Sequence, residues 1–265
     1  MTIHSSAQIH PHAVVEPGAV IGADCRIGPF AVVGPEVTLG RGVELRSHAV
    51  VTGRTEVGDE TVVFSFAVIG EIPQDLKFRG EATRLVIGRR NRIREHATIN
   101  TGTEGGGGVT RVGDDCLIMA GAHVAHDCQI GNHVILVNAA ALAGHCVIED
   151  EVIVGGLSGV HQFVRIGHGA MIGAVTMVTA DVIPHGMVHG PRGTLDGLNL
   201  VGLKRRGAGR GDIAALREML DTLGAGTFRD SARGLADAGG ATNPYVREVL
   251  DFILGPSDRS FLTPR

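Results

Sequence analysis

The sequence predicts an all-β solenoid of hexapeptide repeats, followed by a small α-helical domain at the C-terminal end. Three observations support this prediction. An aliphatic residue recurs at every sixth position over most of residues 3–178. Aromatic side chains are scarce: the chain has no Trp and one Tyr, but 40 Gly. Aliphatic and small residues must therefore fill the core. A helical periodicity begins only after residue 195.

The aliphatic residues form two uninterrupted runs that differ by a shift of one residue in phase. The first run extends from Ile3 to Ile69 and its phase resumes at Ile87; the second extends from Val112 to Val178. A small or β-branched residue usually stands two positions before the aliphatic one. A period of six matches neither a helix nor a lone strand, whose periods are about 3.6 and 2. It is typical of a short strand followed by a corner.

Three such strands and three corners close a triangular coil of about 18 residues, the hexapeptide form of a parallel β-helix. Residues one coil apart then lie about 4.8 Å from each other in neighbouring strands. The four cysteines, Cys25, Cys116, Cys128 and Cys146, all occupy the small inward position of the repeat. We therefore expect buried thiols there, rather than metal ligands or redox centres.

Two segments interrupt the repeat and are expected to be loops that leave the coil. Residues 70–86 lack the hexad pattern and carry Asp75 and Lys77. Residues 100–111 are glycine-rich and contain the shift in phase. No Gly-Lys-Ser/Thr sequence follows these glycines, so we favour a flexible solenoid loop over a phosphate-binding loop.

The repeat ends near Pro184, and the remaining residues follow a helical pattern. Residues 212–223 place Ile213, Leu216 and Leu220 on one face, and Asn243 with Pro244 is typical of the start of a helix. We expect a β-helix over residues 1–190 and an α-helical domain over residues 191–265, which is suited to cap the open end.

Composition excludes several classes of protein. No apolar stretch reaches the roughly 18 residues of a membrane span, and the N-terminus lacks the features of a secretory signal. A net charge of −4 argues against a general nucleic-acid binder. We expect a cytoplasmic protein without a transmembrane segment.

Histidines provide the main candidates for chemistry. We expect surface positions for His4, His10, His12, His48, His133 and His168. The others of interest, His123, His126, His145 and His161, fall within a few neighbouring coils. Stacking places His126, Gly144 and Gln162 in one column and Asp127 and His145 in the next. An imidazole has an ordinary pKa of about 6.5, which suits general-base catalysis near neutral pH.

The residues alone leave several functions open. A histidine could act as the general base of an acyl transfer, with a glycine N–H to stabilise the oxyanion. Three histidines could instead bind Zn²⁺, as in a γ-type carbonic anhydrase. A solenoid without enzymatic activity is a third interpretation. A basic segment over residues 200–217, which includes Arg210 and Arg217, is suited to phosphates or to an acidic protein.

Distinctive motifs occur along the whole chain: IGPFAVVGP, IGEIPQDLKF, NRIREHATIN, AHVAHDC, LAGH, HQF and NLVGLKRRG. With these motifs the chain resembles the acyl-[acyl-carrier-protein]–UDP-N-acetylglucosamine O-acyltransferases of lipid A biosynthesis. The resemblance implies a left-handed parallel β-helix that forms a homotrimer with active sites between subunits. It implies transfer of an R-3-hydroxyacyl chain from the phosphopantetheine of acyl carrier protein to the 3-hydroxyl of UDP-N-acetylglucosamine. It implies no metal and no other cofactor.

The resemblance also implies roles for individual residues. His126 matches the general base, Asp127 the carboxylate that orients it, and Gly144 the residue whose N–H stabilises the oxyanion. The matching substrate-binding residues are Asp75 and Lys77 for the sugar, His123, His145, His161 and Gln162 for the cleft around sugar and thioester, and Asn199, Arg205 and Arg206 for nucleotide or phosphopantetheine. The basic face with Arg210 and Arg217 would suit the acidic carrier protein.

The resemblance is least specific for acyl-chain length. Met171 and Ala174 match the groove that measures the acyl tail, and some long-chain members have Gly at the position of Ala174. Arg192 stands where some relatives have His, and Val201 where some have Glu. A 3-amino sugar is an alternative acceptor. An N-acyltransferase that acts later in the pathway is disfavoured, because it carries an additional domain before the repeat.

Overall fold

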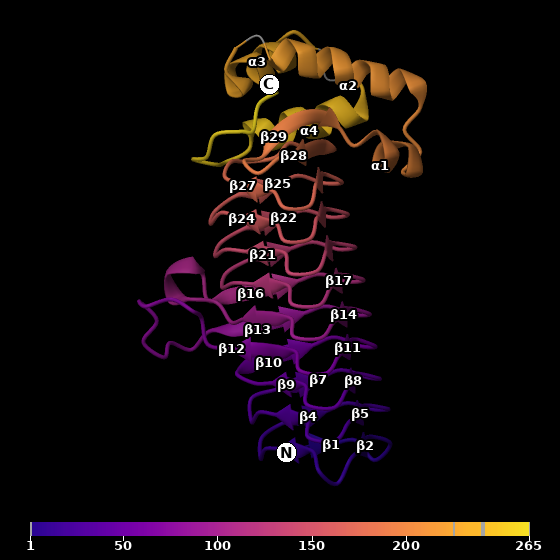
Figure 1. Cartoon of the computed structure of the whole chain (residues 1–265), viewed down its shortest axis with the longest axis vertical. Helices are drawn as coiled ribbons and strands as arrows, with labels where there is room; N and C mark the ends of the chain where they lie inside the picture. The colour runs from indigo at the N-terminus through magenta and orange to yellow at the C-terminus, as the bar shows by residue number, and fades with distance from the viewer. Residues whose placement is uncertain (1, 225, 240–241, 265) are drawn as a thin grey trace.

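A computed structural model of the chain describes residues 2–224, 226–239 and 242–264. Three sheets of 9, 11 and 9 strands form the sides of a triangular prism, and each coil contributes one strand to each sheet. All described strand pairs are parallel except the last pair of the 11-stranded sheet, β28 with β29, which is antiparallel. Up to β27, each strand pairs with the strand three places later in the chain, and sheet B then ends with β26 paired to β28 and β28 to β29. The arrangement is the predicted parallel β-helix (Figure 1).

Most strands are two residues long, as expected when a corner follows every few residues. Sheet A contains β1 (Thr2–Ile3), β4 (Val20–Ile21), β7 (Thr38–Leu39), β10 (Arg54–Val57), β13 (Arg84–Ile87), β16 (Val109–Val112), β19 (Gln129–Ile130), β22 (Val147–Ile148) and β25 (Arg165–Ile166). Sheet B contains β2 (Gln8–Ile9), β5 (Arg26–Ile27), β8 (Glu44–Leu45), β11 (Val62–Val63), β14 (Arg92–Ile93), β17 (Leu117–Ile118), β20 (Ile135–Leu136), β23 (Ile153–Val154), β26 (Met171–Ile172), β28 (Gly186–His189) and β29 (Thr194–Leu198). Sheet C contains β3 (Val14–Val15), β6 (Val32–Val33), β9 (Val50–Val51), β12 (Val68–Glu71), β15 (Thr98–Asn100), β18 (His123–Val124), β21 (Ala141–Leu142), β24 (Gly159–Val160) and β27 (Met177–Val178).

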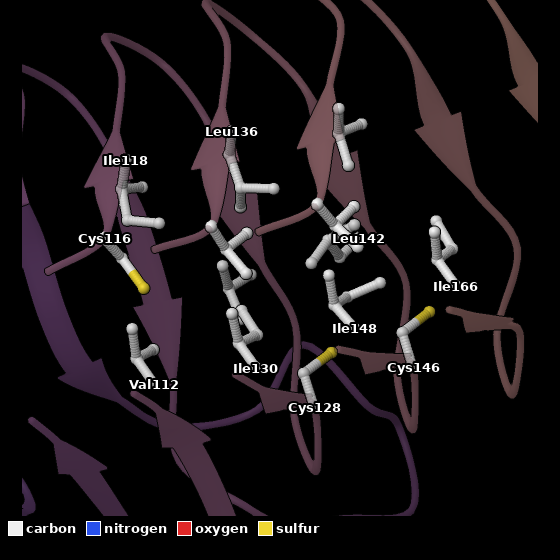
Figure 2. Packing of buried hydrophobic residues seen from close by; sticks show 14 of the residues in the cluster. Val112, Cys116, Ile118, Cys128, Ile130, Leu136, Leu142, Cys146, Ile148 and Ile166 are labelled. Atoms are coloured by element: carbon white, nitrogen blue, oxygen red, sulfur yellow. The ribbon is translucent and has the colours of Figure 1, made fainter. Parts of the chain in front are cut away.

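The aliphatic residue of each hexad forms the core. Ile21, Leu39, Ile69, Ile99 and Leu136 are fully buried, and so are most residues at the small position. All four cysteines are free and buried, and Figure 2 shows Cys116, Cys128 and Cys146 among aliphatic side chains inside the coil. Burial raises the pKa of the Cys116 thiol to about 11, which leaves it unreactive near neutral pH. The prediction of buried thiols is confirmed.

Both predicted loops leave the prism at the same edge, the corner at which strands of sheet C lead into sheet A. We call this edge the C–A corner. One loop connects β12 to β13, and the other connects β15 to β16 and contains the short 3₁₀ helix η1 (Glu104–Gly106). They project together from one side of the prism in Figure 1. Loops on a rigid solenoid are common positions for functional residues.

Helices cover the C-terminal end of the β-helix (Figure 1). They are α1 (Leu200–Arg205), α2 (Arg210–Leu223), α3 (Phe228–Asp237) and α4 (Pro244–Leu254). Asn243 caps α4 through its side chain, with Pro244 in the first turn, as predicted. Within the described residues, no helix is both long and apolar enough to cross a bilayer.

The surface prediction for His168 is wrong. Its side chain is 30% exposed, and its Nδ1 is bonded to Glu248 on α4. The same carboxylate accepts a hydrogen bond from Nε2 of the fully buried His185. Arg206 is hydrogen-bonded to Nδ1, on the other side of the His185 ring. A hexad pattern places His168 at a corner but contains no information about the helix that covers this corner.

Candidate active site

The predicted column of polar residues lies along the C–A corner. His126 and Asp127 form the corner between β18 and β19, Gly144 and His145 the corner one coil further along, and Gln162 the next. Neighbouring corners are joined by hydrogen bonds, such as the one from the His145 N–H to the His126 carbonyl (3.0 Å). A Cβ added to Gly144 would lie 2.5 Å from Cε1 of His126, so the stacking of these two residues requires glycine.

His126 and Asp127 form a hydrogen-bonded pair. Nδ1 of His126 lies 2.8 Å from Oδ2 of Asp127, whose side chain is completely buried. Asp127 has a φ of +60°, a left-handed conformation that turns the corner and that aspartate tolerates better than most residues. An ionised carboxylate can only accept hydrogen bonds, so Nδ1 carries the proton and Nε2 of His126 keeps a free lone pair. This tautomer is the one that a general base requires.

The backbone N–H of Gly144 is available beside this imidazole. The structure records no protein acceptor for it within the described part of the chain. A free N–H next to a general base can stabilise an oxyanion that forms there.

Two further imidazoles are held neutral next to the pair. His145 is stacked face to face on Phe163 with ring centroids 4.3 Å apart, and its edge contacts His126. His123 is bonded through Nδ1 to the Thr98 hydroxyl at 2.7 Å. Burial is the main cause that lowers the pKa of both rings, and the nearby His126 lowers both further, whereas the charge of Asp127 partly offsets the shift of His145. Neutral rings can donate and accept hydrogen bonds to sugar hydroxyls without the cost of a buried charge.

The loop between β12 and β13 brings charge to the same corner. The charges of Asp75 and Lys77 both act on His145, the first raising and the second lowering its pKa. Asp75 also accepts a hydrogen bond from the N–H of Lys77 (2.9 Å), which fixes the turn that presents both side chains. The structure thus places both charges within electrostatic range of His145.

His161 lies next to Gln162 and carries a partner that the sequence analysis missed. Nη2 of Arg259, from the C-terminal segment, lies 2.6 Å from Nδ1 of His161. The two residues are 98 positions apart, so no local pattern could have linked them. Arg259 adds a positive charge at the end of the histidine column.

A second group of predicted residues lies on a different side of the prism. Asn199, Arg205, Arg206 and Met171 line a cavity of about 1040 Å³ between sheet B, the corner that joins sheets A and B, and α1. Asn199 is buried there as the cap of α1, where its side chain accepts from the Gly202 N–H and donates to the Gly169 carbonyl. Arg206 contacts Glu151 and His185. Ala174 and Arg192 are exposed, on and near the remaining corner. One subunit therefore does not bring these residues to His126.

Two groups of side chains among the described residues have ligand atoms close enough to hold a cation: His126, Asp127 and His145, and His168, His185 and Glu248. In the first group both Asp127 oxygens already accept hydrogen bonds, from Thr103 as well as His126. In the second, the cationic Arg206 side chain lies 3.1 Å from His185. The donor sets are thus arranged as hydrogen-bond networks.

A β-helix of hexads with a histidine–carboxylate pair at one corner defines the class of hexapeptide-repeat transferases. Residues 1–35, 18–53 and 110–144 match the family model "bacterial transferase hexapeptide", and residues 181–262 match the second domain of UDP-N-acetylglucosamine O-acyltransferase. The names of similar proteins identify the family within this class. An acyl-[acyl-carrier-protein]–UDP-N-acetylglucosamine O-acyltransferase of Agrobacterium fabrum is 48% identical over 99% of this chain and 98% of its own. One from Paracoccus denitrificans is 78% identical over 77% of each chain.

Solved structures agree with these relatives. The UDP-N-acetylglucosamine acyltransferase from Campylobacter jejuni superposes with a TM-score of 0.91 at 39% identity, over 97% of this chain and all of its own. The Arabidopsis enzyme gives 0.84 at 33% identity, over 96% of this chain and all of its own. The chain belongs to the acyl-[acyl-carrier-protein]–UDP-N-acetylglucosamine O-acyltransferase family.

Proposed function

We propose that this protein transfers an R-3-hydroxyacyl chain from acyl carrier protein to the 3-hydroxyl of UDP-N-acetylglucosamine, the first step of lipid A biosynthesis. The observation that carries the proposal is the His126–Asp127 pair, in which Asp127 holds the Nδ1 proton and leaves Nε2 free to accept one. The names of the relatives support the choice of substrates.

The reaction needs one proton acceptor and one oxyanion donor. Nε2 of His126 takes the proton of the sugar 3-hydroxyl as its oxygen attacks the thioester carbonyl. Asp127 stabilises the imidazolium, and the N–H of Gly144 donates to the oxyanion of the tetrahedral intermediate. Collapse breaks the C–S bond, and His126 returns the proton to the phosphopantetheine sulfur. The chain needs no metal and no cofactor beyond that donor thioester.

Substrate recognition would use the other residues of the C–A corner. We assign Asp75 and Lys77 to the sugar, and His123, His145, His161 and Gln162 to the cleft around sugar and thioester. Asn199, Arg205 and Arg206 would form the nucleotide or phosphopantetheine side, although the Asn199 amide is already engaged within the fold. Arg210 and Arg217 would receive the acidic carrier protein.

A homotrimer of left-handed β-helices would complete the site. The two groups of residues lie at similar heights along the prism but on different sides, so a parallel ring would place the C–A corner of one subunit against the cavity of the next. Leu76 in the β12–β13 loop is 96% exposed and available for such a contact, and Phe30 (53% exposed) and Phe66 (49%) offer further apolar surface on the corner between sheets B and C. Met171, Ala174 and Arg192 would then measure the acyl tail in the groove between subunits.

The catalytic β-helix would span residues 1–190 and the helical domain residues 191–265, in a cytoplasmic enzyme. The proposal is tested with the purified chain, UDP-N-acetylglucosamine and 3-hydroxyacyl carrier proteins of several lengths, with and without a chelator. We expect a chelator-insensitive acylated nucleotide sugar that His126→Ala abolishes and His4→Ala, at an exposed corner far from the site, does not. Acylation of only a 3-amino sugar would change the acceptor. Stoichiometric zinc without acylation would favour the carbonic anhydrase, and no saturable binding of UDP-N-acetylglucosamine would favour a scaffold.

A further inference from the structure

The glycine-rich loop between β15 and β16 encloses the Asp127 carboxylate. The hydroxyl of Thr103 donates to Oδ2 of Asp127 at 2.6 Å, and its backbone N–H donates to Oδ1 at 2.9 Å. Asp127 and Thr103 are 24 positions apart, so the loop reaches across a coil to make these contacts. Every oxygen of the carboxylate therefore has a donor from this loop.

The loop is shaped to keep this position. The N–H groups of Gly106 and Gly108 both donate to the carbonyl of Thr103, which closes the chain around it. A Cβ added to Gly106 would overlap the Asp127 carboxylate, at separations that real Cβ atoms do not show. The glycines thus serve close packing against a buried anion, and the flexible loop expected from composition is in fact held by hydrogen bonds.

Thr103 and His126 share one acceptor atom. Oδ2 of Asp127 accepts from the Thr103 hydroxyl and from Nδ1 of His126 (2.8 Å). A buried carboxylate with fewer donors would rotate or concentrate its charge on the atom that faces the imidazole. Both effects would change the proton affinity and direction of Nε2.

We propose that Thr103 is a positioning residue of this enzyme: it fixes the Asp127 carboxylate so that His126 keeps the tautomer and orientation of a general base. The inference rests on the proposed acyl transfer. Thr103 does not touch the substrate. Its hydroxyl and N–H set the carboxylate plane, and the carboxylate sets the imidazole.

The test compares two threonines of the same loop. Thr103→Val removes the hydroxyl and keeps the β-branched shape, whereas Thr103→Ser keeps the hydroxyl. Thr101→Val is the matched control, because Thr101 lies two residues earlier in the same loop and its hydroxyl is bonded to Thr83 and not to Asp127. Each variant is assayed for kcat and for KM of both substrates between pH 5 and 9, after its thermal unfolding has been compared with wild type.

For Thr103→Val we expect kcat to fall on the order of 10- to 100-fold with little change in KM, because the base is misplaced while the substrate site is intact. The acid limb of the kcat/KM profile should move to higher pH, since Asp127 then concentrates its charge on His126. The other charged or titratable groups of the site are unchanged in all variants: His123 and His145 beside His126, and Asp75 and Lys77 near His145. Thr103→Ser should restore most of kcat, and Thr101→Val should leave the profile in place.

Equal losses in Thr103→Val and Thr101→Val, with unshifted profiles, would overturn the positioning role. A wild-type enzyme without acyl transfer would instead refute the proposed function, so the two failures are distinguishable. Gly106→Ala gives an independent check: it should lower kcat and shift the same limb, because its methyl group must displace the carboxylate. An unshifted limb in that variant, with folding preserved, would also count against the proposal.

Discussion

Glu248 on α4 is hydrogen-bonded to His185 near the last coils of the β-helix, with 3.0 Å between Oε2 and Nε2. Its other oxygen binds His168, so one carboxylate joins the helices to two corners of the solenoid. Arg206 can only donate hydrogen bonds, so Nδ1 of His185 is the acceptor of that contact. Nε2 of His185 therefore carries the proton and donates a hydrogen bond to Glu248.

This contact predicts a pH window for stability. Burial alone would raise the pKa of Glu248, but the hydrogen bonds and charges of the two histidines outweigh it and hold that pKa down at about 2; Glu248 in turn raises the pKa of His168. The Glu248 contribution to the free energy of unfolding is fully present above the ordinary glutamate pKa and is lost as the pH falls through about 2. The His168 contribution is present below about pH 6.5 and is lost as the pH rises through its raised pKa. The contact is strongest between about pH 4.3 and 6.5.

We therefore expect Glu248→Gln to lower the melting temperature by several degrees near pH 6 and to flatten its pH dependence. A hydrogen bond to a charged group contributes about 1.5–3 kcal/mol, and partial exposure of Glu248 favours the lower value. Thermal unfolding at several pH values measures the effect. Glu218→Gln, on the exposed side of α2, is the control and should change little. Parallel pH curves for both variants would contradict the assignment.

Asp127→Asn should remove most of the activity without preventing folding. The amide can present an N–H to Nδ1 of His126, which would move the ring proton to Nε2 and leave no base toward the substrate. We expect kcat to fall on the order of 10²- to 10⁴-fold with KM for the nucleotide sugar within a few-fold of wild type. Steady-state kinetics together with substrate binding by calorimetry check this expectation. A matching loss of binding would indicate a role in the substrate site instead.

Phe163→Ala should remove the ring that packs against His145 and so leave the His145 imidazole less firmly positioned. The stacked ring contributes about 0.5–1.5 kcal/mol beyond burial, so we expect about a 3- to 10-fold loss in kcat/KM. Without this cover the pKa of His145, which burial lowers, should return toward its ordinary value. NMR titration of the histidine signals measures the shift, and Phe163→Tyr, which keeps the ring, should preserve both properties. An unchanged His145 titration in the alanine variant would rule out this stacking effect.

Ala174→Gly tests the proposed tail groove. Removal of one methyl group should shift the preferred acyl chain toward longer donors, by about 10-fold or more in relative kcat/KM, if the groove ends there. Competition between carrier proteins with different chains, read by product mass, gives the ratio. Ala139→Gly at the same edge of the prism is the control. Unaltered chain preference would exclude Ala174 from the groove.

The hexad pattern was sufficient to predict the coil, its buried residues and the column of His126, Gly144 and Gln162, because each follows from a strict repeat in register. It could not predict contacts made by irregular segments. Thr103 reaches Asp127 from a loop without a repeat, and Arg259 reaches His161 from the C-terminal segment. His168 was misjudged for the same reason, since Glu248 lies 80 positions away in a separate helix. Such contacts depend on tertiary packing, which overrides local sequence signals.

The triangular coil converts chain length into rotation about the prism axis. Deletion of one hexad within the solenoid would turn every later residue by one side of the prism relative to the coils before it. A hexad deleted between the β15–β16 loop and His126 would therefore move His126 away from the edge that carries both loops. Deletion of three hexads, one whole coil, would keep the sides of the prism in register. The loops obey no such rule, because they leave and rejoin the coil at a corner. Insertions and deletions in this family should therefore occur as whole coils in the solenoid, whereas a loop can change length at residues that do not contact the site.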